Sequence, residues 1–480
     1  MTYLKSMWDR TAILLLLLIP SPLLSQRSDG LQPNLIVILA DDLGYADVGF
    51  HGSDIKTPHL DQLAKSGVRL NRCYTLPFCT PTRAALLTGR YPFRYGLQTA
   101  AIPADAQYGL NLTETLLPQI LKANGYATAI VGKWHLGHGD EKYWPNNRGF
   151  DYQYGPLVGE IDYYTHSANG KRDWYENGVA LLEEGYTTEL LGAQAVATIK
   201  RHTTSQPLFL YLTFTAPHAP YQAPESAQEL YLNVDDPTRR SYAAMVSVLD
   251  QQVGAVVDAL KERGMFENSL IVFMSDNGGN RNSAMSGESD VSELVLPASN
   301  APYSGGKGTI LEGGCRVVGI VSYPTQLKPQ TYEPPIHVVD WLPTLLEAAN
   351  IEHNFGDRKT DGLTFWGALS GTNPASVREE VIYNIEPFRA AISDEQWKLI
   401  VRPALPPQVE LYDLINDPRE EHDLANAHPE IVGRLKKRVF ELAESAETPL
   451  FLEYMARNSD KSRDFISSII ENGASLSPSP

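Results

Sequence analysis

The chain has 480 residues, of which 43% are hydrophobic and 20% are charged. This length predicts two or three domains or one large domain with an appendage, and the composition excludes a disordered, collagenous or coiled-coil protein. The 57 acidic and 40 basic residues give a net charge of −17, which argues against a nucleic-acid-binding protein because such proteins present a basic face. An anionic substrate would therefore need a locally positive site or a bound cation.

Residues 1–25 have the pattern of an export signal. Lys5 and Arg10 form a basic start, an unbroken apolar run covers 12–19, and a small and polar stretch leads to a cleavage site after Ser25. The run is too short to span a bilayer, and an uncleaved anchor is the alternative interpretation. No later segment is expected to span a membrane, so we expect a protein without a membrane partner after signal cleavage.

Cysteine and glycosylation signals are sparse. The odd count of three cysteines suggests that one is chemically special, while Cys73 and Cys315 either pair or stay buried. One sequon occurs, at Asn111, but Thr113 could equally cap a following helix. These features favour a bacterial periplasmic or secreted protein over an animal lysosomal one.

Short apolar runs alternate with helical patterns along the first three quarters of the chain. Uninterrupted aliphatic and β-branched runs predict strands that are buried on both faces. The strand runs are 35–39, 127–131, 208–212 and 270–274, with helices predicted between them at 113–123 and 242–262. This alternation predicts an α/β fold with a mostly parallel sheet covered by helices.

Polar side chains follow each of the four predicted strands. In open α/β sheets, ligands bind beyond the carboxyl ends of the strands, so we expect these clusters to converge on one crevice. They are Asp41 and Asp42, Lys133 and His135, His218, and Asp276 and Asn277, in chain order.

The C-terminal quarter has a different pattern. Four short strands and a final helix predict a small α+β subdomain with an antiparallel sheet, at 381–384, 389–392, 398–401, 410–413 and 429–443. The predicted organisation is a signal peptide at 1–25, a catalytic α/β domain at 30–366, the subdomain at 370–455 and a tail at 456–480.

Asp41, Asp42, Asp276 and Asn277 offer only oxygen ligands. Such a set suits calcium or magnesium rather than zinc, which prefers histidine and cysteine. Either pair alone would more simply serve a turn or a helix cap. Both pairs together, each after a buried strand, favour a metal site.

The segment 79–89 predicts a helix with a special N-terminus. Pro81 fits the first helical turn and Gly89 fits its end. Cys79 would then lie where backbone N–H groups stabilise an anion, with Arg83 one turn further along the same face. A cysteine in this position usually only packs as an apolar residue, but here it has a cation beside it.

This segment resembles the signature of the type I sulfatases in the alkaline-phosphatase superfamily, Cys-x-Pro-x-Arg followed after four residues by Thr-Gly. The resemblance covers about 34–349, with a C-terminal match at 411–414, and within the family it is greatest to the arylsulfatase B group. Thr82 departs from the commoner serine of the signature. The supporting stretches are Ala40-Asp41-Asp42-Leu43-Gly44, Val48-Gly49-Phe50-His51-Gly52, Gly132-Lys133-Trp134-His135-Leu136-Gly137, Asp162-Tyr163-Tyr164 and Leu311-Glu312-Gly313-Gly314.

The resemblance implies an alkaline-phosphatase-like fold, in which helices sandwich a large mixed sheet, and a sulfuric ester hydrolase. It implies that a separate formylglycine-generating enzyme converts Cys79 to Cα-formylglycine, whose hydrated aldehyde is the nucleophile. One calcium ion would be bound by Asp41, Asp42, Cys79, Asp276 and Asn277. Arg83 and Lys133 would stabilise the hydrated aldehyde, His135 would take the proton that allows sulfate to leave, and His218 and Lys307 would contact the sulfate and the leaving oxygen.

The resemblance also suggests a substrate, a 4-O-sulfated N-acetylgalactosamine end of a glycosaminoglycan, cleaved by exo-action in a pocket. Candidate pocket walls are Tyr163, Tyr164, His166 and Trp174, with a structural role as the alternative for these aromatic residues and the histidine. The alternatives are a different sulfated polysaccharide such as an algal glycan, a phosphomonoesterase or phosphonate hydrolase, and an unmatured protein that only binds sulfated glycans.

Overall fold

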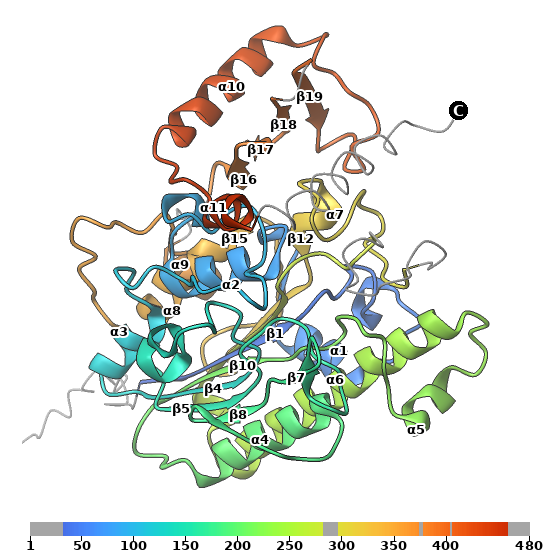
Figure 1. The fold of residues 1–480 in the computed structure, drawn as a ribbon, viewed down its shortest axis with the longest axis vertical. Coiled ribbons are helices and arrows are strands. Elements are labelled where there is room, and N and C mark those ends of the chain that lie inside the picture. The colour runs from blue at the N-terminus through green and yellow to red at the C-terminus, as the bar shows by residue number, and fades with distance from the viewer. Residues whose placement is uncertain (1–31, 282–295, 374–377, 404–405, 459–480) are drawn as a thin grey trace, which may run out of the picture. The chain divides into compact units, whose positions relative to one another are not determined.

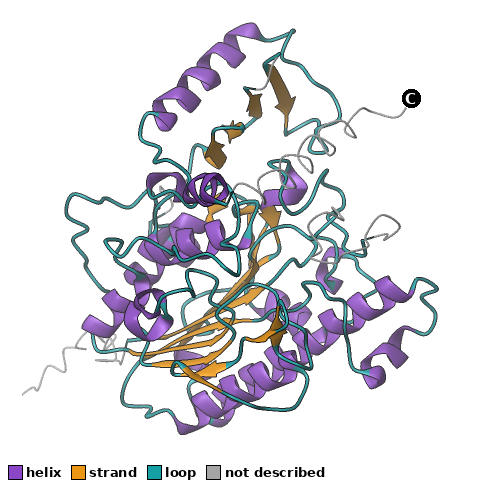
Figure 2. Ribbon diagram, in the orientation of Figure 1, coloured by secondary structure: helices purple, strands orange, loops and turns teal. Residues whose placement is uncertain are grey.

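The computed structural model of the protein describes residues 32–281, 296–373, 378–403 and 406–458, which belong to one unit beginning at Gln32. The predicted signal peptide and residues 459–480 of the predicted tail lie outside the described residues. Figure 1 shows the course of the chain, and Figure 2 shows helices grouped around a strand layer.

A ten-stranded mixed sheet forms the centre of the fold, and the α/β prediction is confirmed. The four predicted strand runs are neighbours in this sheet, in the order β11-β1-β10-β4, and all pair in parallel. In sheet order, its strands are β14 (Gln330–Tyr332), β2 (Val68–Leu70), β13 (Gly319–Ser322), β11 (Ser269–Ser275), β1 (Asn34–Ala40), β10 (Leu208–Thr213), β4 (Ala127–Gly132), β5 (Tyr152–Gly155), β8 (Tyr175–Glu176) and β9 (Val179–Ala180).

Each face of the sheet has its own hydrophobic core, because successive side chains of a strand point to opposite faces. On β1, Leu35, Val37 and Leu39 pack with one set of helices, whereas Ile36 and Ile38 pack with another. The first set is α2 (Cys79–Thr88), α3 (Leu117–Ala123) and α8 (Trp341–Ala348), and the second is α1 (Pro58–Ser66), α4 (Thr187–Arg201), α5 (Glu225–Gln228) and α6 (Pro237–Glu262). These buried runs explain why the strands are apolar throughout.

Two helices differ from their predicted extents. α3 begins at Leu117 rather than at residue 113, because Asn111 Oδ1 accepts hydrogen bonds from the N–H and the hydroxyl of Thr113 and holds a separate turn there. α6 begins at Pro237 and is long and apolar enough to cross a membrane, contrary to the expectation from the sequence. Most of α6 is buried within the protein, against α4 and α1, as expected of a core helix.

Smaller sheets complete the described structure. The predicted C-terminal antiparallel sheet is confirmed, with strand order β16-β17-β18-β19. Its strands are β16 (Val381–Glu386), β17 (Arg389–Ser393), β18 (Trp397–Arg402) and β19 (Gln408–Asp413), accompanied by α10 (Pro429–Ala443). The remaining elements are β3 (Cys73–Tyr74), β12 (Arg316–Val317), β15 (Ile336–His337), β6 (Ser167–Ala168), β7 (Lys171–Arg172), α7 (Glu312–Cys315), α9 (Trp366–Ser370) and α11 (Leu450–Arg457).

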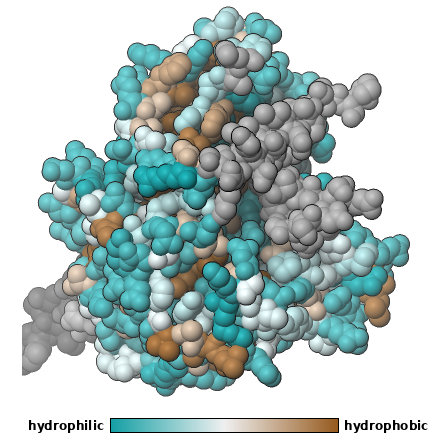
Figure 3. Space-filling model, viewed as in Figure 1, coloured by the Kyte–Doolittle hydropathy of each residue, from teal (hydrophilic) through white to brown (hydrophobic). Residues whose placement is uncertain are grey.

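The surface is mostly polar on the face that Figure 3 shows, and the three cysteines are not joined by disulfides. The face drawn in Figure 3 is mostly hydrophilic, with hydrophobic residues in scattered patches. Cys73, Cys79 and Cys315 are all buried free thiols, so Cys73 and Cys315 do not pair.

Candidate active site

The polar residues at the ends of the four parallel strands meet in one buried cluster, as predicted. Oxygen atoms of Asp41, Asp42 and Asp276 and the sulfur of Cys79 all lie within 4.8 Å of one another, and all four residues are buried. Asp41 and Asp276 directly follow β1 and β11, which pair in parallel, so the sheet itself brings them together.

Three buried cations pair with these three carboxylates. Lys133 Nζ lies 2.6 Å from Asp41 Oδ2, and Lys307 Nζ lies 2.9 Å from Asp42 Oδ2. The guanidinium of Arg83 lies 2.8 Å from Asp276 Oδ2. Charges removed from water are tolerated only when paired in this way, so the cluster is an interlocked set of ion pairs.

The ion pairs shift the proton affinities of the cluster. Burial alone would raise the pKa of Asp41, but the charges of Lys133, His218, Arg83 and Lys307 hold it well below its ordinary value. Burial, reinforced by the charge of Asp41, raises the pKa of Asp276 to about 6. The negative charges of the carboxylates therefore repel one another, and such repulsion is expected where a further cation would bind.

The helix α2 presents Cys79 and Arg83 to the cluster. It begins at Cys79, contains Pro81 in its first turn and ends at Gly89, whose φ of 65° lies in the left-handed region that favours glycine. Arg83 Nη1 donates to the carbonyl of Lys133 at 2.9 Å, and Thr80 Oγ1 donates to the carbonyl of His135 at 2.9 Å. The helix and the loop after β4 are therefore held in register.

Burial disfavours ionisation of the Cys79 thiol. The side chain is 1% exposed, and its burial raises the pKa of the thiol above the ordinary value. Asp41 Oδ1 lies 3.6 Å from the sulfur. An unmodified cysteine here would stay protonated at neutral pH and would be a weak nucleophile.

The two predicted histidines are poised differently. His218 Nδ1 lies 2.6 Å from the carbonyl of Ala219, so in the neutral ring Nδ1 carries the proton and Nε2 is an acceptor. Lys307 Nζ lies 2.8 Å from that Nε2 atom. His218 and Lys307 therefore form a hydrogen-bonded pair beside Asp42.

His135 reaches the cluster through its backbone rather than through a side-chain contact. Its Nε2 atom lies 3.2 Å from the carbonyl of Ile102, and its Nδ1 atom has no hydrogen-bond partner among the described residues. Burial and the charges of Lys133 and Arg83 lower the pKa of His135 well below its ordinary value. A neutral ring with a free Nδ1 atom can accept a proton.

Asn277 has a buried oxygen with no partner. Its Nδ2 atom donates to Asp42 Oδ1 at 2.7 Å, whereas no described residue donates to Oδ1. A buried polar atom left without a hydrogen bond is costly, and a cation would satisfy it. With the three carboxylates, this oxygen completes a donor set that fits a hard divalent cation.

The suggested pocket walls fall into two groups. Trp174, His166 and Tyr163 are fully buried, and Tyr163 Oη donates to the carbonyls of Thr215 and His218, so Tyr163 supports the site while Trp174 and His166 stack on each other inside the protein. Tyr164 is 46% exposed and remains available to a ligand. For the buried three, the structure favours the alternative of a structural role, because aromatic residues beside a polar motif look alike in sequence whether they pack or bind.

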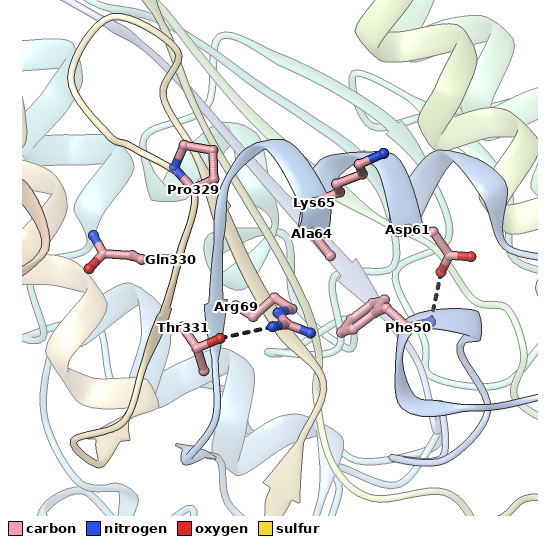
Figure 4. A pocket seen from close by; sticks show the side chains of 8 residues that line it. All are labelled: Phe50, Asp61, Ala64, Lys65, Arg69, Pro329, Gln330 and Thr331. Atoms are coloured by element: carbon pink, nitrogen blue, oxygen red, sulfur yellow. Dashed lines mark hydrogen bonds between the residues drawn. The ribbon is translucent and has the colours of Figure 1, made fainter.

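A surface cavity elsewhere holds none of the predicted site residues. It has a volume of about 370 Å³, and Figure 4 shows Arg69 and Asp61 among its lining residues. Arg69 donates to Thr331 and Asp61 accepts from the N–H of Phe50, so these two polar groups already have partners. The buried cluster, not this cavity, concentrates the reactive groups.

Glu160 is one neighbour of the cluster that the sequence analysis missed. Its Oε1 atom lies 3.5 Å from His218 Nε2, while half of its side chain remains exposed. Only its position beside Gly159 and the stretch 162–164 could have drawn attention to it, because a loop glutamate carries no chemical signal of its own.

Comparisons with known protein families cover the whole site. The family described as Sulfatase matches residues 33–351, and the family described as N-sulphoglucosamine sulphohydrolase, C-terminal, matches residues 306–445. All predicted site residues lie within the first match, and the second contains Lys307 and the C-terminal sheet.

Individual relatives agree. Arylsulfatase J of Mus musculus is 35% identical over 477 residues, which covers 86% of this chain and 76% of the relative. N-acetylgalactosamine-6-sulfatase of Sus scrofa is 34% identical over 360 residues, covering 70% of this chain and 66% of the relative. The crystal structure of Ps i-CgsB superimposes with a TM-score of 0.78 at 33% identity, covering 87% of this chain and 94% of that one, and a second structure of it holds k-i-k-neocarrahexaose.

Proposed function

The chain belongs to the sulfatase family and hydrolyses sulfate esters, and we propose that it does so on a sulfated carbohydrate with the buried cluster as its active site. The observation that carries this proposal is the meeting of Cys79 with three carboxylates and three cations at the ends of four adjacent strands. With a bound cation added to these three balanced ion pairs, a cluster of this kind can hold the singly charged anion of a sulfate ester in an otherwise acidic protein.

Calcium fits the donor set. Asp41, Asp42, Asp276 and Asn277 would hold the ion, with Cys79 in its matured form as a further ligand. All of these are oxygen donors, including the hydrated aldehyde of matured Cys79, and the unpartnered oxygen of Asn277 supports the assignment. When bound, the cation would neutralise the sulfate and favour the charge that develops in the transition state.

Cys79 would act after conversion to formylglycine by a maturing enzyme. Its burial and its protonated thiol argue against the cysteine itself as the nucleophile. The hydrated aldehyde would supply a hydroxyl nucleophile and a second hydroxyl, which allows sulfate to be expelled.

The remaining side chains would handle charge and protons. Arg83 and Lys133, fixed by Asp276 and Asp41, would hold the matured side chain and sulfate oxygens in place. His135 would accept a proton at its free Nδ1 atom. Lys307 and His218 would donate to the leaving oxygen, since their contact of 2.8 Å lets a proton pass between them.

The substrate we favour is a 4-O-sulfated N-acetylgalactosamine end. A relative named N-acetylgalactosamine-6-sulfatase supports an amino-sugar substrate. A sulfated algal glycan is the second candidate, because the similar structure of Ps i-CgsB contains a neocarrahexaose. The single-cation donor set disfavours phosphomonoester chemistry, which commonly uses two metals.

The experiment is sulfate release from unsaturated chondroitin 4-sulfate and 6-sulfate disaccharides and from carrageenan oligosaccharides. The protein is co-expressed with a formylglycine-generating enzyme, conversion is verified by peptide mass, and Cys79→Ala is the control. Release from the 4-sulfate alone would support the favoured substrate, and release from carrageenan alone would support the second. No release from any of them by converted protein would overturn both substrate proposals.

We further propose export by cleavage after Ser25 and separate catalytic and C-terminal parts at 30–366 and 370–455. N-terminal sequencing of protein recovered from the periplasm or medium tests the first point. A mature chain that retains residues 1–25 would contradict it.

A further inference from the structure

Glu160 lies at the edge of the proposed active site without being part of its buried ion pairs. Its Oε1 atom lies 3.5 Å from His218 Nε2, and its side chain is 50% exposed where that of His218 is 2% exposed. Within the described residues this is the one close polar contact of Glu160, and it becomes an ion pair only when His218 is protonated. Its carboxylate therefore faces both the buried cluster and the solvent.

The loop that carries Glu160 is fixed from two sides. The carboxylate of Asp173 accepts the N–H groups of Leu157 and Val158, at 3.2 and 2.7 Å. The carbonyl of Leu157 in turn accepts the N–H of His135 at 3.0 Å. The position of Glu160 is thus set relative to both histidines of the site.

Gly159 adds a steric reason for this placement. A Cβ atom at this position would lie 2.2 Å from His135 Cε1, so the backbone passes directly against the imidazole. Only glycine allows this approach. The loop therefore packs directly against the site, and Glu160, which follows Gly159, lies beside His218.

Its charge sets Glu160 apart from the other carboxylates of the site. Asp41, Asp42 and Asp276 each have a cationic partner within 2.9 Å. Glu160 lies further from any cation, and Lys307 Nζ already occupies the near side of His218 Nε2. The half-exposed carboxylate of Glu160 lies beside His218, which contacts the leaving oxygen in the proposed function. Its negative charge should therefore influence which anionic substrates bind.

We propose that Glu160 is a specificity residue that accepts a hydrogen bond from a neutral donor next to the scissile ester and repels a second anionic group there. The preferred substrate carries a hydroxyl or amide N–H beside the sulfate, and a neighbouring sulfate or carboxylate is disfavoured. This inference rests on the proposed function, in which His218 contacts the leaving oxygen.

The expected size follows from the interaction of two charges. At a separation of about 6 Å and an effective dielectric constant of about 40, repulsion between unit charges corresponds to roughly tenfold in rate. Replacement of Glu160 by glutamine removes the charge but keeps the size and a hydrogen-bonding oxygen. The repulsion should therefore vanish while the neutral contact is weakened.

The test uses two aryl sulfates that differ only beside the ester, 2-(hydroxymethyl)phenyl sulfate and 2-carboxyphenyl sulfate. We expect Glu160→Gln to raise the ratio of kcat/KM for the carboxylate over the hydroxymethyl substrate about tenfold relative to the original protein. Intrinsic differences in leaving group cancel in this comparison. Glu444→Gln, which removes one exposed charge from the end of α10, is the matched control and should leave the ratio unchanged.

Three outcomes would overturn the inference. An unchanged ratio in Glu160→Gln would mean that Glu160 only supports His218, since a structural role would slow both substrates equally. The same rise in Glu444→Gln would attribute the effect to net charge. Failure of the original, formylglycine-bearing protein to release sulfate from these esters and from the chondroitin and carrageenan oligosaccharides alike would contradict the proposed function itself and remove the basis of the inference.

Discussion

Two buried clusters of charge in this protein look alike in composition but differ in completeness. The first is the active-site cluster, formed by Asp41, Asp42, Asp276, Asn277, Arg83, Lys133 and Lys307. The second, here called the C-terminal cluster, lies between the loop after Lys307 and the C-terminal sheet and is formed by Glu312, Lys398, Glu420, Tyr74 and Tyr383. Both are almost wholly shielded from water.

In the C-terminal cluster each carboxylate oxygen has a partner from the chain itself, although Glu420 Oε1 meets Lys398 as an ion pair without a hydrogen bond. Glu312 accepts hydrogen bonds from Tyr74 at 2.9 Å, Tyr383 at 2.6 Å and Lys398 at 3.2 Å. Glu420 accepts the N–H of Glu312 at 2.7 Å and pairs with Lys398 at 2.8 Å. In the active-site cluster, by contrast, no described residue donates a hydrogen bond to Asn277 Oδ1, while the carboxylates of Asp41, Asp42 and Asp276 converge with Cys79. The comparison teaches that burial of charge marks a binding site only where donors and acceptors are left over.

Removal of calcium should produce the largest difference between the two clusters, because only the active-site cluster is expected to bind the ion. Chelation should lower sulfatase activity at least about 100-fold and lower Tm by about 5 °C, because three carboxylates then face one another without their cation. Activity assays and thermal unfolding with and without EGTA measure this.

Added calcium should restore both quantities, and the variant Lys398→Met should respond to EGTA as the original protein does, because the C-terminal cluster needs no ion. Full activity in protein shown to be metal-free by elemental analysis would refute a calcium site.

The variant Lys398→Met tests the C-terminal cluster. Within the described structure Lys398 pairs with both Glu312 and Glu420, so its loss should lower the free energy of unfolding by about 3–5 kcal/mol, since Glu420 then has no cation beside it and Glu312 keeps only Arg316 at 3.6 Å. The shift of the urea midpoint measures this change, whereas kcat of the folded fraction should change less than about twofold.

The matched control combines Lys398→Met with Glu312→Gln and Glu420→Gln, which removes all three charges together. This variant should recover most of the lost stability. If it is as unstable as the single variant, packing rather than charge holds the cluster together.

The central strands and the convergence of the active-site carboxylates could be predicted from the sequence, whereas the C-terminal cluster could not. The four central strands were predictable because strands buried on both faces are apolar throughout, and the convergence of Asp41 with Asp276 follows from parallel strand ends. The C-terminal cluster was not, because Glu312 meets Lys398 and Tyr74 across long sequence separations that leave no local pattern. Periodicity reports which face is buried, but not which buried polar groups will pair.

The pH dependence of stability offers a smaller test of the C-terminal cluster. Burial, together with the charge of Glu312, raises the pKa of Glu420 from 4.5 to about 7. The native state therefore binds a proton that the unfolded state releases, so this contribution is complete below about pH 4.5 and is lost as pH rises through about 7.

The contribution amounts to as much as about 3 kcal/mol, and Glu420→Gln should remove it. Unfolding of both proteins between pH 4.5 and 7.5 measures the difference, with calcium present to keep the active-site cluster constant. Parallel stability profiles would show that Glu420 is ionised throughout the range.

The smallest expected effect concerns the contact between the two regions. Arg389, on β17, donates a hydrogen bond to the carbonyl of Gly308, and its guanidinium lies 5.9 Å from the ring centre of Phe78. These two residues adjoin Lys307 and Cys79, so one side chain of the C-terminal sheet steadies both. Arg389→Met should lower kcat about three- to tenfold with little change in KM, because small displacements of catalytic groups slow chemistry more than binding.

Steady-state kinetics of Arg389→Met, Arg389→Lys and Arg402→Met separate positioning from stability. Arg402 lies on β18, across from the end of β17 that carries Arg389, and its ion pair is with Glu410, so its replacement should alter Tm without altering kcat. Lysine at position 389 can still donate to Gly308, and it should restore part of the lost rate. If Arg389→Met and Arg402→Met have the same kcat, the sheet stabilises the fold but does not position the active site, and the two clusters are independent neighbours.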